Sequence, residues 1–398
     1  MMDVRLTNDL PRTADLVVIG GGVVGAATAF YASRAGLRTV VIERRPLLCT
    51  LTTPVAAGGF RAQFDNPDET ALVQESIATF DHFGEVTSLP GYDLRLQKQG
   101  YLFVTTSPES ARRQAERVSM QHSWGVDDVE LLTGAEVRYR FPYVDEAVIS
   151  ARYRADDGFL DPKLLTYGYA QASDATFVVS TAATGFSFSG GRIAGVQTSR
   201  GDVSTGAVVV AAGPFSGEVA RLAGLDLAVS TVRRQRMVMP EVPEVPADAP
   251  FVIDEDNGAH WRPAFRGAYL VFTDPSTPPS DPSWSVPTDP DFTFTLLDPS
   301  SEHNVARVCP FWRTVWQRGT DHWILHAGQY TYTHDHRPYL GPTSIPGLHL
   351  NMGYSGHGVM GSAGGSRRVI DLLTGRADQA QNPFRWDRPV VPHAFDVI

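Results

Sequence analysis

Three glycines near the start of the chain have the spacing of a turn that binds phosphate. They follow an apolar run at residues 16–19, which predicts a short strand buried on both faces. In such a turn Gly20 permits the tight bend and Gly22 lets the backbone approach a pyrophosphate. Gly25 then lets the following helix pack closely against the strand. The chemistry predicted by this spacing is the binding of a dinucleotide.

The residues after the glycines supply a helix whose start favours negative charge. Residues 26–36 are rich in small side chains and end in Gly36, a typical residue just past a helix end. The backbone N–H groups of Val23 and Val24 lie in the first turn of this helix, where they have no intrahelical acceptor. Because these groups and the helix dipole attract anions, we expect Val23 and Val24 to contact the pyrophosphate.

An acidic residue completes the predicted dinucleotide site. A second apolar run at residues 37–42 ends in Glu43, which follows Gly25 by 18 positions. A carboxylate at about this spacing binds ribose hydroxyls. We expect Glu43 and the adjacent Arg44 to bind the nucleotide, in a strand–helix–strand unit.

Further segments predict the same kind of sheet, spread along the chain. They are strands at residues 177–184 and 207–212, a hairpin turning at Gly190-Gly191, and a glycine-rich loop before a helix at 362–373. The segments between these strands lack the short apolar runs of a buried parallel sheet. They contain an amphipathic helix at 69–83, an aromatic strand at 267–273 and a Pro- and Ser-rich loop at 274–290. This order predicts a nucleotide-binding domain interrupted by a second domain.

Composition excludes several classes of protein. The chain has 398 residues and a formal net charge of −10, which argues against a nucleic-acid partner. It contains no run of about 18 apolar residues and no signal-peptide pattern, so we expect no transmembrane segment and a cytoplasmic location. Cys49 and Cys309 are the only cysteines, which indicates reduced thiols.

Six motifs in order resemble the FAD-dependent amine and amino-acid oxidoreductases typified by D-amino-acid oxidase, glycine oxidase and sarcosine oxidase. The motifs are IGGGVVGAATAFYASRAG with VIER, TTPVAAGGFRAQF, DDGFLDP, VVVAAGPFS, HWRP with YTYTHDHRPYLGP, and NMGYSGHGVMGSAGG. The resemblance implies an α/β fold: a Rossmann-like FAD-binding domain interrupted by an α+β substrate domain with an antiparallel sheet. We expect the FAD-binding domain at 1–60, 150–227 and 331–398, and the substrate-binding domain at 61–149 and 228–330.

The resemblance also implies which residues contact FAD. The loop with Thr52, Thr53 and Gly58 would lie along the flavin and pyrophosphate, and Ala183 would contact adenine through its backbone. Gly213 belongs to the third FAD-contacting strand. The closing loop that would wrap the flavin ring contains Gly353, Tyr354, Ser355, Gly356, His357 and Gly358. A glycine-rich loop before a helix offers N–H donors where hydride transfer leaves negative charge on the flavin.

The chain departs from relatives that tether FAD or carry functional lysines. Gly328 and Val55 stand where some branches carry the cysteine or histidine that attaches FAD, so we expect non-covalent FAD. Met360 replaces a lysine that helps to hold the substrate carboxylate in monomeric sarcosine oxidases. The only lysines, Lys98 and Lys163, fall outside the segment of the oxygen-activating lysine in those enzymes.

Arginines and tyrosines are therefore the candidates for substrate binding and catalysis. Arg61 and Arg262 suit a carboxylate because the guanidinium group pairs with it through two hydrogen bonds. Period-2 spacing places Tyr330 and Tyr332 on one strand face, towards the active cavity or within the core. The predicted set is Arg61, Tyr330 and His357 for catalysis, and Arg61, Arg262, Tyr330 and Met360 for substrate contacts. His334 and His336 match no metal-ligand pattern, and we interpret them as loop residues.

The resemblance implies hydride transfer from the carbon next to an amine to flavin, giving an imine that hydrolyses. The substrate would be an amino acid, an N-alkyl amino acid or a small amine, and the electron acceptor oxygen or another molecule. Alternatives are a flavoenzyme that oxidises 2-hydroxy acids, a flavoprotein subunit or assembly factor with little turnover, and a nicotinamide dehydrogenase. Aromatic residues at Trp261, Phe265, Trp312 and Trp316 indicate either a bulky pocket or core.

Overall fold

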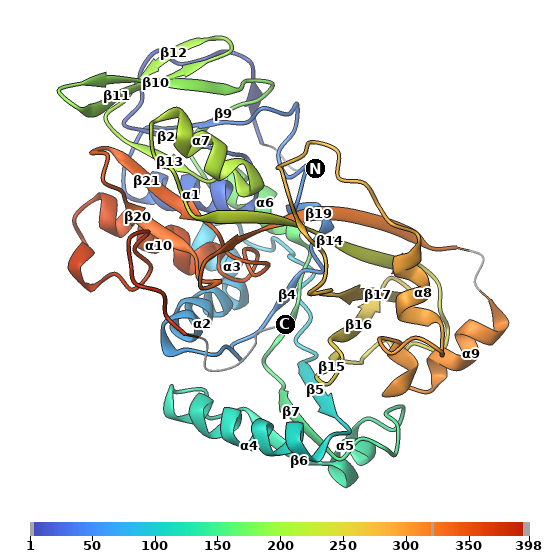
Figure 1. Ribbon diagram of the computed structural model, residues 1–398. Coiled ribbons are helices and arrows are strands. Elements are labelled where there is room, and N and C mark those ends of the chain that lie inside the picture. The colour runs from blue at the N-terminus through green and yellow to red at the C-terminus, as the bar shows by residue number, and fades with distance from the viewer. Residues whose placement is uncertain (1–3, 320–321, 393–398) are drawn as a thin grey trace.

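The computed structural model describes residues 4–319 and 322–392, which fold around two large β-sheets (Figure 1). The first sheet has seven strands in the order β1-β9-β3-β2-β13-β21-β20, all parallel except the edge strand β20. Its strands are β1 (Leu6–Thr7), β2 (Leu16–Ile19), β3 (Thr39–Ile42), β9 (Thr176–Val178), β13 (Val208–Val210), β20 (Tyr339–Pro342) and β21 (Leu348–Met352).

Both faces of this sheet are covered, which explains why its strands are continuous apolar runs. Side chains such as Val18 and Val209 pack under a layer of helices, whereas Val17 and Val208 face the opposite layer. The helical layer contains α1 (Val23–Arg34), α2 (Pro67–Asp81), α6 (Pro162–Gln171) and α10 (Ser362–Leu373). The opposite layer contains α7 (Ser216–Leu222) and a three-stranded sheet of β10 (Ala183–Ser189), β11 (Arg192–Thr198) and β12 (Gly201–Ser204).

The second sheet forms the other half of the molecule and has nine strands. Its long central strand β14 pairs with β17, β18 and β19, and the order continues through β16, β15, β5, β7 and β6. The strands are β5 (Tyr101–Thr105), β6 (Glu130–Thr133), β7 (Ser150–Arg154), β14 (Val229–Met239), β15 (Phe251–Asp254), β16 (Ala259–Ala264), β17 (Gly267–Phe272), β18 (Pro279–Ser280) and β19 (Ile324–Thr333). All pairs are antiparallel except β5 with β15.

Five further helices and one strand pair complete the α-helices and strands of the described residues. The helices are α3 (Phe83–Thr87), α4 (Pro108–Ser123), α5 (Gly134–Arg140), α8 (Asp291–Leu297) and α9 (Phe311–Arg318). The strands β4 (Gly59–Phe60) and β8 (Gly158–Phe159) pair with each other where the chain passes between the two sheets.

The predicted fold class is confirmed: an interrupted Rossmann-like sheet with a mostly antiparallel second sheet. The segment boundaries differ in detail from the expected ones. Strand β7 pairs with β5 in the second sheet, although residues from 150 onward were expected in the nucleotide-binding part. Helix α2, expected in the substrate-binding part, packs against α10 beside the first sheet. Helical amphipathicity alone does not tell which of two cores a helix will cover.

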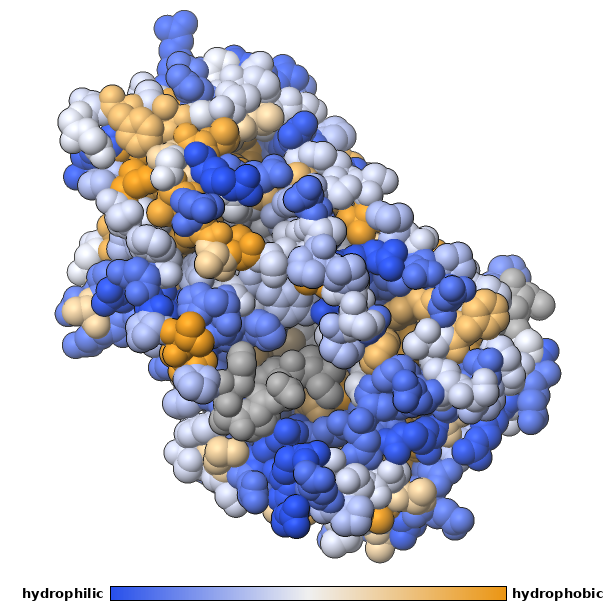
Figure 2. All heavy atoms as spheres, in the orientation of Figure 1, coloured by the Kyte–Doolittle hydropathy of each residue, from blue (hydrophilic) through white to orange (hydrophobic). Residues whose placement is uncertain are grey.

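The described residues contain no helix that is both long and apolar enough to cross a membrane. Figure 2 shows apolar side chains at the surface over β10, β11 and α7, among mostly polar surroundings. Phe188 and Leu222, which are 46% and 44% exposed, belong to these elements.

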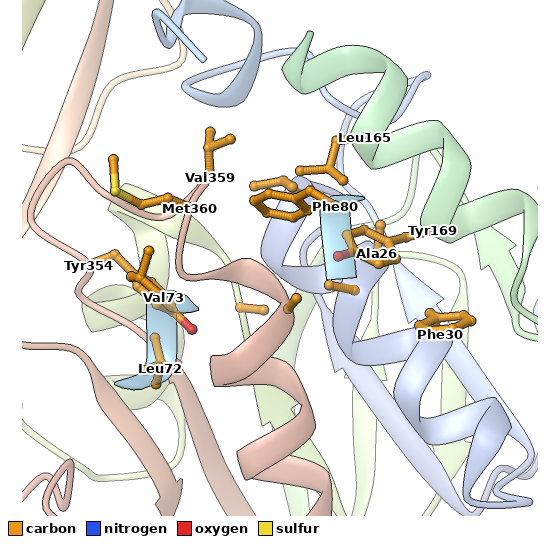
Figure 3. Packing of buried hydrophobic residues seen from close by; sticks show 14 of the residues in the cluster. Ala26, Phe30, Leu72, Val73, Phe80, Leu165, Tyr169, Tyr354, Val359 and Met360 are labelled. Atoms are coloured by element: carbon orange, nitrogen blue, oxygen red, sulfur yellow. The ribbon is translucent and has the colours of Figure 1, made fainter. Parts of the chain in front are cut away.

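The largest apolar cluster joins four helices of the nucleotide-binding half (Figure 3). Its members include Ala26, Phe30, Leu72, Val73, Phe80, Leu165, Tyr169, Tyr354, Val359 and Met360. Gly364, in the first turn of α10, lets α10 approach α2 closely. A Cβ atom placed on Gly364 would stand 2.3 Å from the backbone oxygen of Leu72, so the helices would have to separate.

We therefore expect Gly364→Ala to destabilise the protein. Alanine gains about 0.5–1 kcal/mol as a helix former, but overpacking a rigid contact costs about 1–3 kcal/mol. The net result should be a lower urea midpoint and a free energy of unfolding reduced by about 1–2 kcal/mol. Gly206→Ala is the matched control, because a Cβ there meets no atom within 4 Å. Equal midpoints for both variants would contradict the close contact.

Candidate functional site

The turn between β2 and α1 has the tight geometry that its glycines predict. Gly20 has a φ of 117°, and a Cβ on it would stand 2.3 Å from the Ala211 oxygen. A Cβ on Gly25 would stand 1.9 Å from the Gly20 oxygen, so only glycine allows α1 to pack here. The N-cap residue of α1, Gly22, offers no side-chain cap, and the first turn contains no acidic residue. These N–H groups therefore suit an anion.

The side chain of Glu43 stabilises the turn from the end of β3. Its Oε2 accepts a hydrogen bond from the Gly21 N–H and its Oε1 accepts one from the Arg45 N–H, both at 2.7 Å. Burial is the largest influence on Glu43 and raises the pKa of its carboxyl, opposed by these N–H donors. Glu43 thus fixes the phosphate turn in addition to facing the adjacent cavity.

One cavity runs along the carboxyl ends of β2, β3 and β13 and continues to β19 and β21. The predicted residues that line it are Gly20, Gly22, Val23, Val24, Glu43, Arg44, Thr52, Thr53, Ala183, Gly213, Tyr330, Gly353, Tyr354, Ser355, Gly356 and Gly358. The predicted residues outside its lining are Gly25, Gly58, Arg61, Arg262, His357 and Met360. The structure therefore brings most of the expected cofactor residues together, and fewer of the expected catalytic residues.

The loop at 50–57 connects the cavity to both sheets. The Thr53 Oγ1 accepts a hydrogen bond from the Val23 N–H at 3.3 Å, at the start of α1. The Thr52 hydroxyl donates to the Gln329 oxygen on β19 at 3.2 Å. Gly22 has room for only a small group here, because a Cβ on it would stand 3.2 Å from the Thr53 Oγ1.

Gly58 acts through packing. It has a φ of 76°, and a Cβ on it would stand 2.1 Å from the Leu160 oxygen. The close passage of the Leu160 segment is therefore enough to explain why position 58 is a glycine.

The closing loop at 353–358 adopts backbone angles that favour glycine. Gly353 and Gly356 have φ values of 77° and 106°, and Ser355 between them also has a positive φ of 50°. A Cβ on Gly356 would stand 2.4 Å from the ring of Tyr330, so this loop lies directly against β19. Below it, the Tyr354 hydroxyl donates to the Asn351 Oδ1 at 2.6 Å.

A buried polar network holds that loop to the two central helices. The Asn351 amide donates to the Thr28 hydroxyl of α1 at 2.9 Å and to the Ser366 hydroxyl of α10 at 3.0 Å. These bonds connect the phosphate turn, through α1, to the closing loop.

The His357 imidazole points away from the cavity. Its Nε2 lies 2.8 Å from the Glu69 Oε1, and its ring packs edge-on against Phe64 at 5.2 Å. Asn66 caps α2 by accepting from the Glu69 N–H at 2.8 Å, and its amide also donates to the Glu69 carboxylate at 2.7 Å. The side chain of His357 therefore ties the closing loop to α2, and its predicted catalytic role has no geometric support.

Arg61 is buried beneath the cavity, 4% exposed. Its Nε donates to the Gln63 oxygen at 3.4 Å, and its guanidinium lies 5.1 Å from the centre of the Phe64 ring and 5.9 Å from that of Tyr101. Burial lowers the pKa of Arg61, opposed first by the nearby Tyr101 and Asp157.

Two further arginines come from the second sheet and meet at Tyr269. The guanidinium groups of Arg236 and Arg262 lie 4.1 Å and 4.4 Å from the Tyr269 ring centre. Arg236 donates to the Ala56 oxygen at 2.6 Å, and Arg262 donates to the Ala57 oxygen at 2.7 Å. Within residues 4–319 and 322–392, neither guanidinium forms an ion pair with a carboxylate, although the Asp161 carboxylate acts on both from a longer distance. Burial lowers the pKa of both side chains.

Sequence reasoning identified Arg262 and missed Arg236. The segment VRRQRMVM contained a signal, because Val232, Arg234, Arg236 and Val238 share one strand face by period-2 spacing. A charged residue between apolar ones on such a face indicates a buried cation.

The tyrosine strand β19 lies along the cavity. The rings of Tyr330 and Tyr332 are 6.2 Å apart, and Tyr330 lines the cavity beside Gly356. Burial raises the pKa of Tyr330 to about 12, so its phenol stays protonated at neutral pH. His334 contacts the Tyr339 hydroxyl at 2.7 Å, and the described residues contain no His, Cys, Asp and Glu cluster that suits a metal ion.

The remaining candidates belong to packing. Met360 is 7% exposed within the helical cluster, where it contacts apolar side chains (Figure 3). Trp261 and Trp312 are buried with ring centres 5.8 Å apart, so they form core beneath the second sheet. Phe265, by contrast, is 72% exposed. Cys49 and Cys309 are buried free thiols.

The lining of the cavity has the features that a flavin dinucleotide requires. It combines a helix start with a glycine at the N-cap, a glycine turn that leaves room for a pyrophosphate, a carboxylate at the end of β3 and a glycine-rich loop at the far end. In open α/β sheets, ligands bind at the carboxyl ends of the strands, which is where this cavity lies.

Comparison with known proteins agrees with this geometry. A family model described as FAD dependent oxidoreductase (DAO) matches residues 15–372. The chain is 27% identical to FAD-dependent oxidoreductase domain-containing protein 1 of Xenopus laevis, over 92% of this chain and 80% of that protein. It is 24% identical to mitochondrial sarcosine dehydrogenase of Homo sapiens. That match covers 94% of this chain but only 41% of the length of the sarcosine dehydrogenase.

Solved structures share the fold. L-Proline dehydrogenase from P. horikoshii superposes with a TM-score of 0.81 at 23% identity, covering 94% of this chain and 96% of that one. Glycine oxidase from Geobacillus kaustophilus superposes with a TM-score of 0.80 at 24% identity, covering 96% and 100%. The resemblance inferred from the motifs and the FAD cofactor are confirmed, and the chain belongs to the DAO family of FAD-dependent oxidoreductases.

Proposed function

We propose that this chain oxidises a small amine that carries a carboxylate, such as an amino acid or an N-alkyl amino acid. A hydride would leave the carbon next to the nitrogen, and the resulting imine would hydrolyse in water. Bound FAD supplies the hydride acceptor. The observation that supports this proposal is the pair of buried arginines, Arg236 and Arg262, on the sheet that faces the closing loop and the loop at 50–57.

Buried cations without carboxylate partners favour an anionic ligand. A desolvated guanidinium is costly unless it is paired, and carbonyl oxygens offset only part of that cost. Each guanidinium retains N–H groups beyond those that bond to the residues at 54–57. A substrate carboxylate would supply the missing negative charge in a region of low dielectric.

The tyrosines suit the amine end of such a substrate. Tyr330 lines the cavity, and after burial and Tyr332 its pKa is influenced by Arg234, Arg236 and Arg61. A protonated phenol orients a neutral amine by hydrogen bonding, which keeps the nitrogen lone pair available as the hydride leaves. We assign a positioning role to Tyr330, with Arg236 and Arg262 as carboxylate ligands.

Three relatives or neighbours support the amine class by their names. Sarcosine dehydrogenase, L-proline dehydrogenase and glycine oxidase are each named for a carboxylate-bearing amine. Oxidation of a 2-hydroxy acid is the second candidate, since the arginine pair would bind its carboxylate equally well.

The first test is anaerobic reduction of the FAD-loaded protein. We expect absorbance near the flavin band to bleach with one or more amino acids or N-alkyl amino acids and to stay unchanged with amines that lack a carboxylate. Subsequent admission of air separates an oxidase, which recovers its colour quickly, from a dehydrogenase. Bleaching by hydroxy acids alone would replace the proposal by its alternative. A yellow protein bleached by nothing would favour a subunit or assembly role.

The arginine assignment predicts a selective defect in Arg262→Met. Losing a charge-assisted hydrogen bond costs about 1.5–3 kcal/mol, which corresponds to a roughly ten- to hundredfold higher KM for the carboxylate substrate. Steady-state kinetics should show kcat changing less than KM, and Arg262→Lys should recover part of the loss. Arg266→Met is the matched control, because Arg266 is exposed and pairs with Glu241 at 3.0 Å. An equal defect with the corresponding carboxylate-free amine would exclude this role.

We also propose that FAD is held without a covalent bond. Gly328 lies against the loop at 50–57, where a Cβ would stand 3.6 Å from the Val55 Cβ, and neither residue offers a nucleophile. Acid precipitation should therefore release all of the flavin into the supernatant, leaving the protein pellet colourless. A variant Gly328→Cys provides the comparison, since it restores a thiol at that position. Flavin retained by the wild-type pellet would contradict the proposal.

A further inference from the structure

Trp284 is a residue of the second sheet's half that reaches the cofactor cavity. It lies in the Pro- and Ser-rich loop between β17 and α8, which in Figure 1 rises from the second sheet towards the first. The side chain is 36% exposed, yet it lines the same cavity as the phosphate turn. An aromatic residue in this loop was not expected to contribute to the site.

The Trp284 ring is enclosed by side chains of the nucleotide-binding half. It stacks on Phe215 with ring centres 3.7 Å apart and an interplanar angle of 11°. The Arg44 guanidinium lies 4.5 Å from the Trp284 ring centre, within cation–π distance. Arg45 donates from its Nη1 to the Trp284 oxygen at 3.2 Å. All of these residues line the cavity.

The topology explains why this contact lies above the nucleotide position. Arg44 follows β3 and Phe215 follows β13, and these strands flank β2 on either side. The phosphate turn follows β2, so it lies between the two residues. Trp284 contacts both of them and thereby spans the crevice in which the dinucleotide is bound.

The loop is anchored on both sides of Trp284, since beyond it the Asp289 N–H donates to the Gln235 Oε1 at 2.6 Å. Strand β18, in the first part of the loop, pairs with β14. Next to Trp284, the Ser283 N–H donates to the Gln329 Oε1 at 2.8 Å, and the Gln329 amide donates to the Asp281 oxygen at 2.8 Å. Gln329 is 2% exposed and also lines the cavity. Prolines at 279 and 282 further restrict the unfolded alternatives of the loop.

We propose that Trp284, Phe215 and Arg44 form an aromatic and cationic wall at the nucleotide end of the FAD site, so that a loop of the substrate-binding half retains the cofactor. FAD release then requires Trp284 to separate from Phe215. This inference rests on the FAD cofactor and is independent of the proposed substrate.

The test is the rate at which FAD leaves the loaded protein. After dilution into an excess of the apo form of a protein that binds FAD tightly, release is followed by the change in flavin fluorescence, with no substrate present. An aromatic stack and a cation–π contact together correspond to about a five- to fiftyfold effect, so we expect release from Trp284→Ala to be faster by at least about fivefold. Trp284→Phe should stay close to the wild type because it preserves the stack.

A control variant and a second variant of the wall separate this role from general destabilisation. Trp323→Ala removes a tryptophan of similar exposure, 43%, that does not line the cavity, and it should release FAD at the wild-type rate. Arg44→Met removes only the cation and should also speed release, without deleting an aromatic ring. Far-UV circular dichroism verifies folding of each variant. Wild-type release rates in both Trp284→Ala and Arg44→Met would overturn the proposal.

Discussion

The loop at 50–57 is the constraint on which both halves of the molecule depend. Within it, the Thr53 hydroxyl accepts a hydrogen bond from the start of α1, and the Thr52 hydroxyl donates one to β19. Its carbonyl groups at Ala56 and Ala57 accept from Arg236 and Arg262 of the second sheet. The same eight residues therefore set the phosphate turn, the wall of the cavity and the position of the buried cations. A change in this loop would alter cofactor and substrate geometry together.

Desolvated charge explains why the arginines lie where they do. A surface arginine contributes little through ion pairs, because water screens the charge. Arg236 and Arg262 are 6% and 7% exposed, and the Tyr269 ring and backbone carbonyls provide only partial compensation. A fold keeps such groups when a ligand completes them, and buried, perturbed ionisable groups concentrate at functional sites for that reason. Their charge would then orient a substrate before any hydride moves.

Much of the nucleotide-binding half was predictable from the sequence because its signals are local. The glycine turn, the helix at 362–373 and the strand at 16–19 each follow from neighbouring residues, and the structure places them within a residue or two. The role of His357 was not predictable, since its partner Glu69 lies 288 positions away along the chain. The period-2 pattern around Arg236 indicated a buried cation, but not its partners Pro54 and Ala56, which become neighbours only when the two sheets pack. Local patterns specify elements, whereas long-range contacts decide which side chains face the cavity.

Interruption of the nucleotide-binding half gives the second half a means to influence cofactor retention. The chain passes between the two sheets several times, so strands such as β19 belong to the second sheet while their neighbours enter the first. Gln329 on β19 contacts both the loop of Trp284 and, through its backbone, Thr52. A displacement of β19 would therefore move the loop of Trp284 at the nucleotide end of the cavity. It would also move Tyr330, which packs against Gly356 in the closing loop. The proposed retention of FAD would therefore depend on the position of this one strand.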